Sequence, residues 1–243
     1  MYEAPKFLPA GDRAIVIELG DEISVECNRR VHSLHRAVAR AEIPGVVDII
    51  PTYRSLLVEY DASQVSFADI SDGLANIGAG SADTPEEDAT VIHLPVLYGG
   101  EYGPDLEYVA QNAGMSTDEV IDLHSGTEYP VYMMGFTPGF PYLGGMSERI
   151  ATPRLSTPRG VIPAGSVGIA EAQTGVYPIE SPGGWQLIGC TPLRLFDVDR
   201  NPPSLIDAGD CVRFVPLADE DEYQHIEEQV AVGSYQVTTT TKA

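Results

Sequence analysis

Hydrophobic residues in the first part of the chain recur with two different periods. The segment Arg13–Leu19 is strand-like, because apolar and β-branched residues dominate it. After Ser24, a residue type favoured as a helix N-cap, apolar residues recur at spacings of three and four as far as Ala41, which predicts a helix with one apolar stripe. Two β-rich segments follow, Val46–Ile50 and Ser55–Tyr60, joined by a length of chain suited to a hairpin turn. The chain therefore opens with the order β-α-β-β.

A second helix and a linker follow this hairpin. Ser66 and Asp69 resemble a capping box, and the apolar residues after Ser66 again have helical spacing. The segment Gly78–Asp88 is small and acidic, which predicts a linker or exposed loop, and Val91–Leu97 is a further strand that could close the sheet. The order βαββα(β) predicts a ferredoxin-like domain over residues 1–88.

The composition changes in the second half of the chain. Residues 135–191 contain eleven glycines and seven prolines among short apolar segments. Helices do not tolerate this density of Gly and Pro, whereas the tight corners of a small barrel require it. We therefore expect this Gly- and Pro-rich part to form an all-β barrel. It would belong to a β-barrel domain over residues 89–218, with Cys211–Pro216 as the last strand, and the whole chain would have an α+β fold.

Two other segments have helical patterns. Residues 104–126 predict two short helices, but a DNA-binding helix-turn-helix is disfavoured because such an acidic chain lacks cationic flanks. Residues 219–243 are acidic and end in TTTTKA, which predicts a helix fragment followed by a frayed tail.

The charge of the chain excludes several classes of partner. Asp and Glu number 36 against 14 Lys and Arg, which gives a formal net charge of −22. A surface with this charge repels phosphate backbones and anionic membranes, so we expect neither a nucleic-acid nor a membrane partner. Twelve of the basic residues are arginines and only Lys6 and Lys242 are lysines, and we hypothesise a halophilic host whose salt-rich cytoplasm screens the acidic surface.

Targeting, metal and redox signals are missing from the sequence. The N-terminus has no basic segment followed by an apolar one, and no stretch approaches 18 apolar residues, so we expect a cytoplasmic protein. The three cysteines are isolated, which predicts neither a zinc site nor a disulfide framework.

The negative charge is not spread evenly. Residues 130–196 contain four Arg and three acidic residues, a balance of +1, so the rest of the chain carries −23. A segment kept clear of acids is expected where a surface binds an anion or is covered by a partner. A buried core with few charges of either sign is the alternative interpretation.

Several residues in this window have chemistry suited to a binding site. Arg154 and Arg159 could each form two hydrogen bonds to a carboxylate or a phosphate. Gly183 and Gly184 precede Trp185 and would let the backbone approach a ligand closely. P-loop, HExxH and GxSxG motifs do not occur, so the usual nucleotide loop, zinc protease and serine hydrolase sites are excluded.

His124 stands at the end of the second predicted short helix. It could act as a general base. The alternative is a cationic side chain that stabilises a helix C-terminus.

Seven motifs, most of them rich in Gly or Pro, follow one another along the second half: GGEYGPDL (99–106), LHS (123–125), GFTPGFPYLG (135–144), TPRLSTPR (152–159), IPAGSVGIA (162–170), QTGVYPIESPGGWQLIG (173–189) and GDCVRF (209–214). They closely resemble one family, which contains the B subunit of the prokaryotic 5-oxoprolinase. The same family is labelled allophanate hydrolase subunit 1 or carboxyltransferase subdomains C and D, and is similar to the Kip-type inhibitor of a sporulation histidine kinase. The resemblance spans residues 7–216.

The resemblance implies a fold, an activity and partners. The second domain would be a cyclophilin-like barrel. The chain would act with a sister C subunit and a separate A subunit, which together open the lactam of 5-oxoproline to glutamate with ATP, and it would be nearly inactive alone. No metal or biotin site is evident in this chain. A urea carboxylase-type or allophanate hydrolase-type carboxyltransferase half and a Kip-type kinase inhibitor stay open as alternatives.

The resemblance also implies site residues. Those carried over for catalysis are Arg154, Arg159, His124 and Ser166. Those carried over for binding of an amide substrate are Gln173, Thr174, Tyr177, Gly183, Gly184, Trp185 and Phe140. Each also has a structural interpretation, in which the glycines turn corners, the tryptophan is core and the serine caps a strand.

Overall fold

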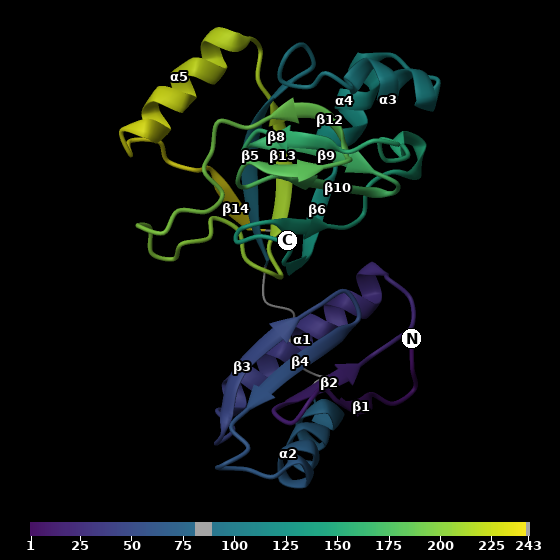
Figure 1. Ribbon diagram of the computed structural model, residues 1–243, viewed down its shortest axis with the longest axis vertical. Helices are drawn as coiled ribbons and strands as arrows, with labels where there is room; N and C mark the ends of the chain where they lie inside the picture. The colour runs from purple at the N-terminus through teal and green to yellow at the C-terminus, as the bar shows by residue number, and fades with distance from the viewer. Residues whose placement is uncertain (81–88, 242–243) are drawn as a thin grey trace. The chain divides into compact units, whose positions relative to one another are not determined.

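The computed structural model describes residues 1–80 and 89–241 (Figure 1). The chain divides into two compact units, residues 1–87 and 88–243, and each has its own hydrophobic core. Both units combine helices with a β-sheet, so the α+β class expected from the sequence is confirmed. None of the described helices is long and apolar enough to cross a membrane.

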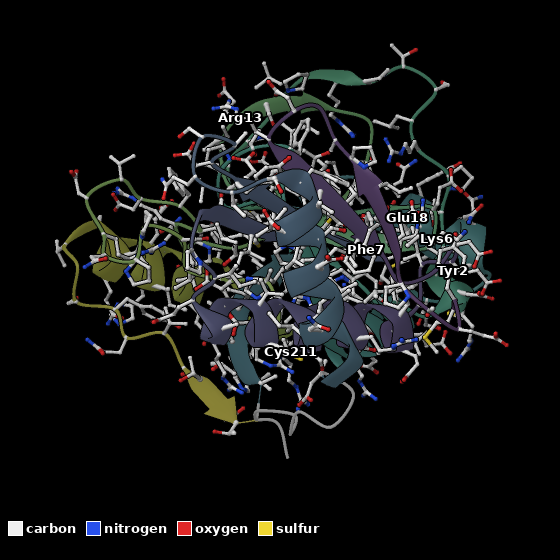
Figure 2. The ribbon with its side chains drawn as sticks, turned by 90° about the horizontal axis from the view of Figure 1, so that it is seen from below. Tyr2, Lys6, Phe7, Arg13, Glu18 and Cys211 are labelled. Atoms are coloured by element: carbon white, nitrogen blue, oxygen red, sulfur yellow. The ribbon has the colours of Figure 1, made fainter. Side chains whose placement is uncertain are left out.

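Unit 1 packs two helices on one face of a four-stranded antiparallel sheet. Its elements are β1 (Lys6–Pro9), β2 (Ala14–Glu18), α1 (Val25–Ala41), β3 (Val46–Pro51), β4 (Ser55–Tyr60) and α2 (Phe67–Gly80). The sheet order is β1-β2-β4-β3, and Lys6 lies beside Glu18 across β1 and β2 (Figure 2). The predicted caps are confirmed, since the Ser24 side chain accepts from Cys27 N at the start of α1 and the Asp69 backbone N–H donates to Ser66 Oγ at the start of α2.

Two expectations for unit 1 need correction. The strand predicted over Val91–Leu97 does not close this sheet, because it pairs in unit 2, and β1 takes the edge position beside β2 instead. The linker predicted from Gly78 begins later, because α2 extends to Gly80. The rest of that predicted linker, residues 81–88, lies outside the described residues.

Unit 2 is a closed barrel with helices at its periphery. Its elements are β5 (Thr90–Tyr98), α3 (Leu106–Ala113), α4 (Thr117–Ser125), β6 (Glu128–Met134), β7 (Pro141–Leu143), the 3-10 helix η2 (Glu148–Ile150), β8 (Arg159–Ile162), β9 (Ser166–Ala170), β10 (Gln173–Val176), β11 (Ser181–Gly183), β12 (Gln186–Cys190), β13 (Cys211–Pro216), α5 (Glu220–Ala231) and β14 (Thr239–Thr241). Seven strands form the ring β12-β9-β10-β7-β6-β13-β5, which closes where β12 pairs with β5. Alternate side chains point inward and fill the barrel, among them Leu94, Val131, Ile188 and Phe214.

The two predicted helices between β5 and β6 are present as α3 and α4. Gly114 ends α3 with a left-handed conformation, as expected of a glycine C-cap. The N-cap of α4 is Ser116, which forms a capping box with Glu119.

The helix fragment predicted within residues 219–243 is confirmed as α5, but the residues after it are not all frayed. Asp219 caps α5, which buries Tyr223 and Ile226. Thr239–Thr241 then pair with the first three residues of β5, beside the part of that strand that β12 leaves unpaired. A strand on an open edge forms backbone hydrogen bonds that a frayed tail would leave to water, and the composition of this segment gave no sign of that distant pairing.

Candidate functional site

A chain of hydrogen bonds runs through the interior of the barrel and includes His124. The Tyr98 hydroxyl is 2.8 Å from His124 Nδ1, and His124 Nε2 is 2.8 Å from Thr174 Oγ1. Thr174 Oγ1 donates to the Gly168 carbonyl at 3.0 Å. Because Thr174 has one hydroxyl proton and gives it to Gly168, it accepts from His124, so Nε2 carries a proton. Tyr98 then donates to Nδ1 of a neutral imidazole.

The surroundings of His124 agree with a neutral ring. It is fully buried, and its ring stacks on Phe214 with centroids 4.4 Å apart. Burial lowers the pKa of His124 from 6.5 to about 3. The side chain is therefore not the helix C-terminal cation of the second interpretation. As a general base it would have to act from a site without solvent access and with both ring nitrogens already in hydrogen bonds.

Other predicted site residues also lie in the barrel wall. Ser166 and Thr174 are buried, and the Ser166 carbonyl accepts from the Tyr177 backbone N–H. Gln173, the first residue of β10, is partly exposed at the start of the same strand as Thr174. The residues Ser166, Gln173 and Thr174 are not members of the aromatic cluster described next.

The predicted aromatic residues gather in a second, smaller cluster on the barrel. Phe140, Tyr177 and Trp185 pack edge to face with ring centroids 5.6 to 6.2 Å apart, and Ile162 and Leu187 pack with them. All five side chains are buried. The cluster packs against the ribbon of β8 and β11, because Ile162 belongs to β8 and Gly183 of β11 lies against Tyr177.

Arg159 lies at the start of β8 and is held on two sides. One guanidinium nitrogen is 2.7 Å from Asp105 Oδ1, and another donates to the Trp185 carbonyl at 3.3 Å. The second carboxylate oxygen of Asp105 accepts from the Leu187 backbone N–H. Asp105 can reach β12 because Gly103 lies against the Ile188 carbonyl, where a Cβ would overlap the backbone.

Arg154 lies above the same tryptophan from the loop before β8. Its guanidinium carbon is 5.9 Å from the centre of the Trp185 ring, within the range of a cation–π interaction. Arg154 is exposed, whereas Trp185 is 6% exposed. Trp185 is therefore held by Arg159 at its carbonyl and covered by Arg154 at its ring.

Tyr177 and the two glycines complete this face. Burial raises the pKa of Tyr177 above its usual 10, although Arg154, the Trp185 backbone and Arg159 each lower it, so the phenol stays protonated near neutral pH. Gly183 has no room for a side chain, since a Cβ would clash with Tyr177, whereas a Cβ at Gly184 would make ordinary contacts. The structure thus brings together Arg154, Arg159, Tyr177, Gly183, Gly184 and Trp185, with Phe140 beneath them.

A separate cavity of about 470 Å³ opens between α5 and the barrel. Its lining includes Phe196, Tyr223 and Glu227, and none of the predicted site residues lines it. Groups of three or more His, Cys, Asp or Glu side chains that could hold a metal ion were not found within residues 1–80 and 89–241.

Comparison with known proteins places the chain in a family. Residues 5–206 match the family described as carboxyltransferase domain, subdomain C and D. The chain belongs to this family. The match covers nearly all of unit 1 and extends through unit 2 as far as residue 206, so it includes Arg154, Arg159 and Trp185.

Similar proteins cover most of the chain. The 5-oxoprolinase B subunit of Bacillus subtilis (strain 168) is 48% identical over 232 residues, which cover 90% of this chain and 95% of that protein. The protein of the same name from Escherichia coli O157:H7 is 43% identical over 206 residues, covering 85% and 93%. The crystal structure of TTHA0988 has a TM-score of 0.74 at 39% identity and covers 85% of this chain, which spans 40% of that one. Urea amidolyase of Saccharomyces cerevisiae is 24% identical and is matched over 13% of its length.

Sequence reasoning missed Asp105 as a member of this group. Asp105 lies in the quoted motif GGEYGPDL, but its spacing from Arg159 gives no sign of contact, because the two are 54 positions apart. One signal was available. Asp105 is an acidic residue in a Gly- and Pro-bearing motif, which could have suggested an ion pair with one of the few arginines.

Proposed function

We propose that this chain is the B subunit of an ATP-dependent 5-oxoprolinase, which acts with its A and C subunits to open 5-oxoproline to glutamate. The observation that carries the proposal is the 48% identity to a 5-oxoprolinase B subunit over nearly the full length of both chains. The urea carboxylase alternative has weaker support, since the urea amidolyase match is half as identical and occupies a small part of that protein.

The exposed face of unit 2 supports an amide-opening role. Opening a lactam breaks the bond between the carbonyl carbon and nitrogen, and negative charge develops on the carbonyl oxygen before that bond breaks. Phenol and backbone N–H groups are donors suited to such an oxyanion, and Tyr177 lies against Gly183, next to Gly184, on this face. Neither a nucleophile nor a histidine base is required of this chain by that scheme.

ATP is assigned to the complex rather than to this chain. The sequence has no P-loop, and its two lysines are Lys6 and Lys242. ATP supplies the driving force for hydrolysis of an unreactive amide, and the residues described above would hold and orient the amide.

The experiment is to co-express the chain with its candidate A and C subunits, purify the complex in high salt and measure glutamate formed from 5-oxoproline with and without ATP. We expect ATP-dependent glutamate that requires all three chains. A complex that forms without making glutamate, yet consumes urea with biotin carboxylase, would support the carboxyltransferase alternative. Failure to form any complex would favour the kinase-inhibitor alternative.

The finer sequence expectations are part of this proposal. Unit 1 would be a variant of the ferredoxin-like fold in which β1 replaces the closing strand, and unit 2 would be cyclophilin-like. The protein would work in a salt-rich cytoplasm, because the formal charge of −22 needs screening. Thermal melts in low and in molar KCl test this, and a melting temperature that does not fall in low salt contradicts it.

A further inference from the structure

The two arginines of the exposed face differ in how much of their charge is already used. Arg159 is paired with Asp105 at 2.7 Å, and the two side chains are only 29% and 13% exposed. Its other described contact is with the Trp185 carbonyl. A guanidinium that is neutralised and partly buried in this way has little remaining attraction for a second anion.

Arg154 differs from Arg159 because no carboxylate of the described residues pairs with it. Within residues 1–80 and 89–241, no carboxylate lies within 4.0 Å of the Arg154 guanidinium, which lies over the Trp185 ring and also lowers the pKa of the Tyr177 phenol. In the same described ranges Glu171 pairs with Thr152 in a β-bridge two residues away, yet it forms no ion pair with Arg154. Arg154 is therefore an unneutralised cation in a part of the chain from which acids are nearly absent.

The backbone on both sides of Arg154 is fixed. The Pro153 carbonyl accepts from Gln186 Nε2 at 2.8 Å, and the Leu155 N–H donates to the Gly184 carbonyl at 2.7 Å. Fixing the residues before and after Arg154 reduces the entropy lost when its guanidinium binds a ligand. The Tyr177 phenol, which both guanidiniums influence, adds a neutral donor beside it.

We infer that Arg154 binds the carboxylate of an anionic cyclic-amide substrate, whereas Asp105 and Arg159 form a pair that positions β8 and Trp185 beneath it. This inference rests on the proposed function, from which the lactam acid 5-oxoproline follows as substrate. The inference gives different roles to Arg154 and Arg159, for which the sequence predicted the same role.

The chain provides its own probe, because Trp185 is its only tryptophan and lies under Arg154. The experiment titrates the full-length chain with 5-oxoproline, and separately with pyrrolidin-2-one, which has the same lactam and no carboxylate, and follows tryptophan fluorescence. We expect a saturable change with 5-oxoproline and at least about 10-fold weaker binding of pyrrolidin-2-one, as is typical when a charge-assisted hydrogen bond is lost.

Three variants separate the roles. Arg154→Gln is expected to weaken 5-oxoproline binding by about 10- to 100-fold. Arg149→Gln, which removes another exposed arginine of the same window, is the matched control and should bind as the unmodified chain does. Asp105→Asn keeps an oxygen to accept from Leu187 N–H but removes the charge that pairs with Arg159, so the positioning of Trp185 is impaired and the Kd for 5-oxoproline should rise by clearly less than in Arg154→Gln.

The inference is overturned if neither ligand gives saturable binding, if both bind equally, or if Arg154→Gln binds as the unmodified chain does. It is also overturned if Asp105→Asn weakens binding as much as Arg154→Gln, because Asp105 would then act beyond positioning. Binding is measured without turnover. Arg154-dependent binding in a complex that makes no glutamate would support the carboxylate site and reject the proposed function, and the reverse result would reject only the inference.

Discussion

The interior of the barrel around His124 and the exposed face around Arg154 both contain polar groups of the kind found in active sites. In the interior, both ring nitrogens of His124 and the hydroxyl protons of Tyr98 and Thr174 are in hydrogen bonds. On the face, Arg154 has an aromatic ring below it and no counter-ion in the described part of the chain. A polar residue can act on a ligand only with hydrogen-bonding or charge capacity that the fold has not already used.

The contrast extends to the two arginines. Arg159 resembles His124, because its guanidinium already donates hydrogen bonds to Asp105 and to the Trp185 carbonyl. Residue type alone would have ranked His124 and Arg159 with Arg154. Their partners separate them into two groups, one that stabilises the fold and one that is free to bind.

The largest expected effect comes from removing His124 from the hydrogen bonds in the barrel interior. His124→Leu leaves the Tyr98 hydroxyl without an acceptor and removes the donor to Thr174, both in a buried site, so we expect a loss of about 3–5 kcal/mol in the free energy of unfolding. Urea unfolding in molar KCl measures it. A loss below about 1 kcal/mol would show that the chain of hydrogen bonds contributes little, and would remove the contrast with the exposed face.

The pH dependence of stability gives the next effect. The pKa of His124 falls from 6.5 to about 3 on folding, so between these values the unfolded chain binds a proton that the folded chain does not. Stability from this group is complete above 6.5 and decreases as pH falls, by about 1.4 kcal/mol per pH unit. His124→Gln cannot titrate, and the difference between its unfolding free energy and that of the unmodified chain should shrink by about 2 kcal/mol between pH 6.5 and about pH 5. Parallel pH profiles for the two proteins would contradict a neutral His124.

The smallest effects compare Asp105 with Arg154. Asp105→Ala leaves the Leu187 N–H and the Arg159 guanidinium without their acceptor and should cost about 1–2 kcal/mol. Arg154→Gln should change stability by less than about 0.5 kcal/mol, because the side chain is exposed and makes no ion pair within the described ranges. Thermal melts of Asp105→Ala and Arg154→Gln, with Arg149→Gln as the surface control, measure these changes in stability. Equal destabilisation by the two changes would mean that Arg154 also serves the fold.

Local patterns predicted much of the fold. Ser24 and the Ser66–Asp69 pair cap the helices they were expected to cap, because capping depends on residues three or four positions apart. The Gly- and Pro-rich half forms the expected barrel, whose tight corners need these residues. Errors arose where pairing partners had to be chosen, as when β5 joined the barrel and Thr239–Thr241 joined β5.

The sequence by itself determined the two-part α+β organisation, the family and the part of the chain where acids are sparse, because these depend on composition, periodicity and motifs. Only the tertiary structure decided which polar residues are engaged. Asp105 meets Arg159 across 54 positions and His124 meets Thr174 across 50, and such distant contacts are set by barrel closure rather than by neighbouring residues. Closure of the barrel decides which side chains meet a partner. It brings Asp105 to Arg159, whereas no carboxylate of the described residues pairs with Arg154.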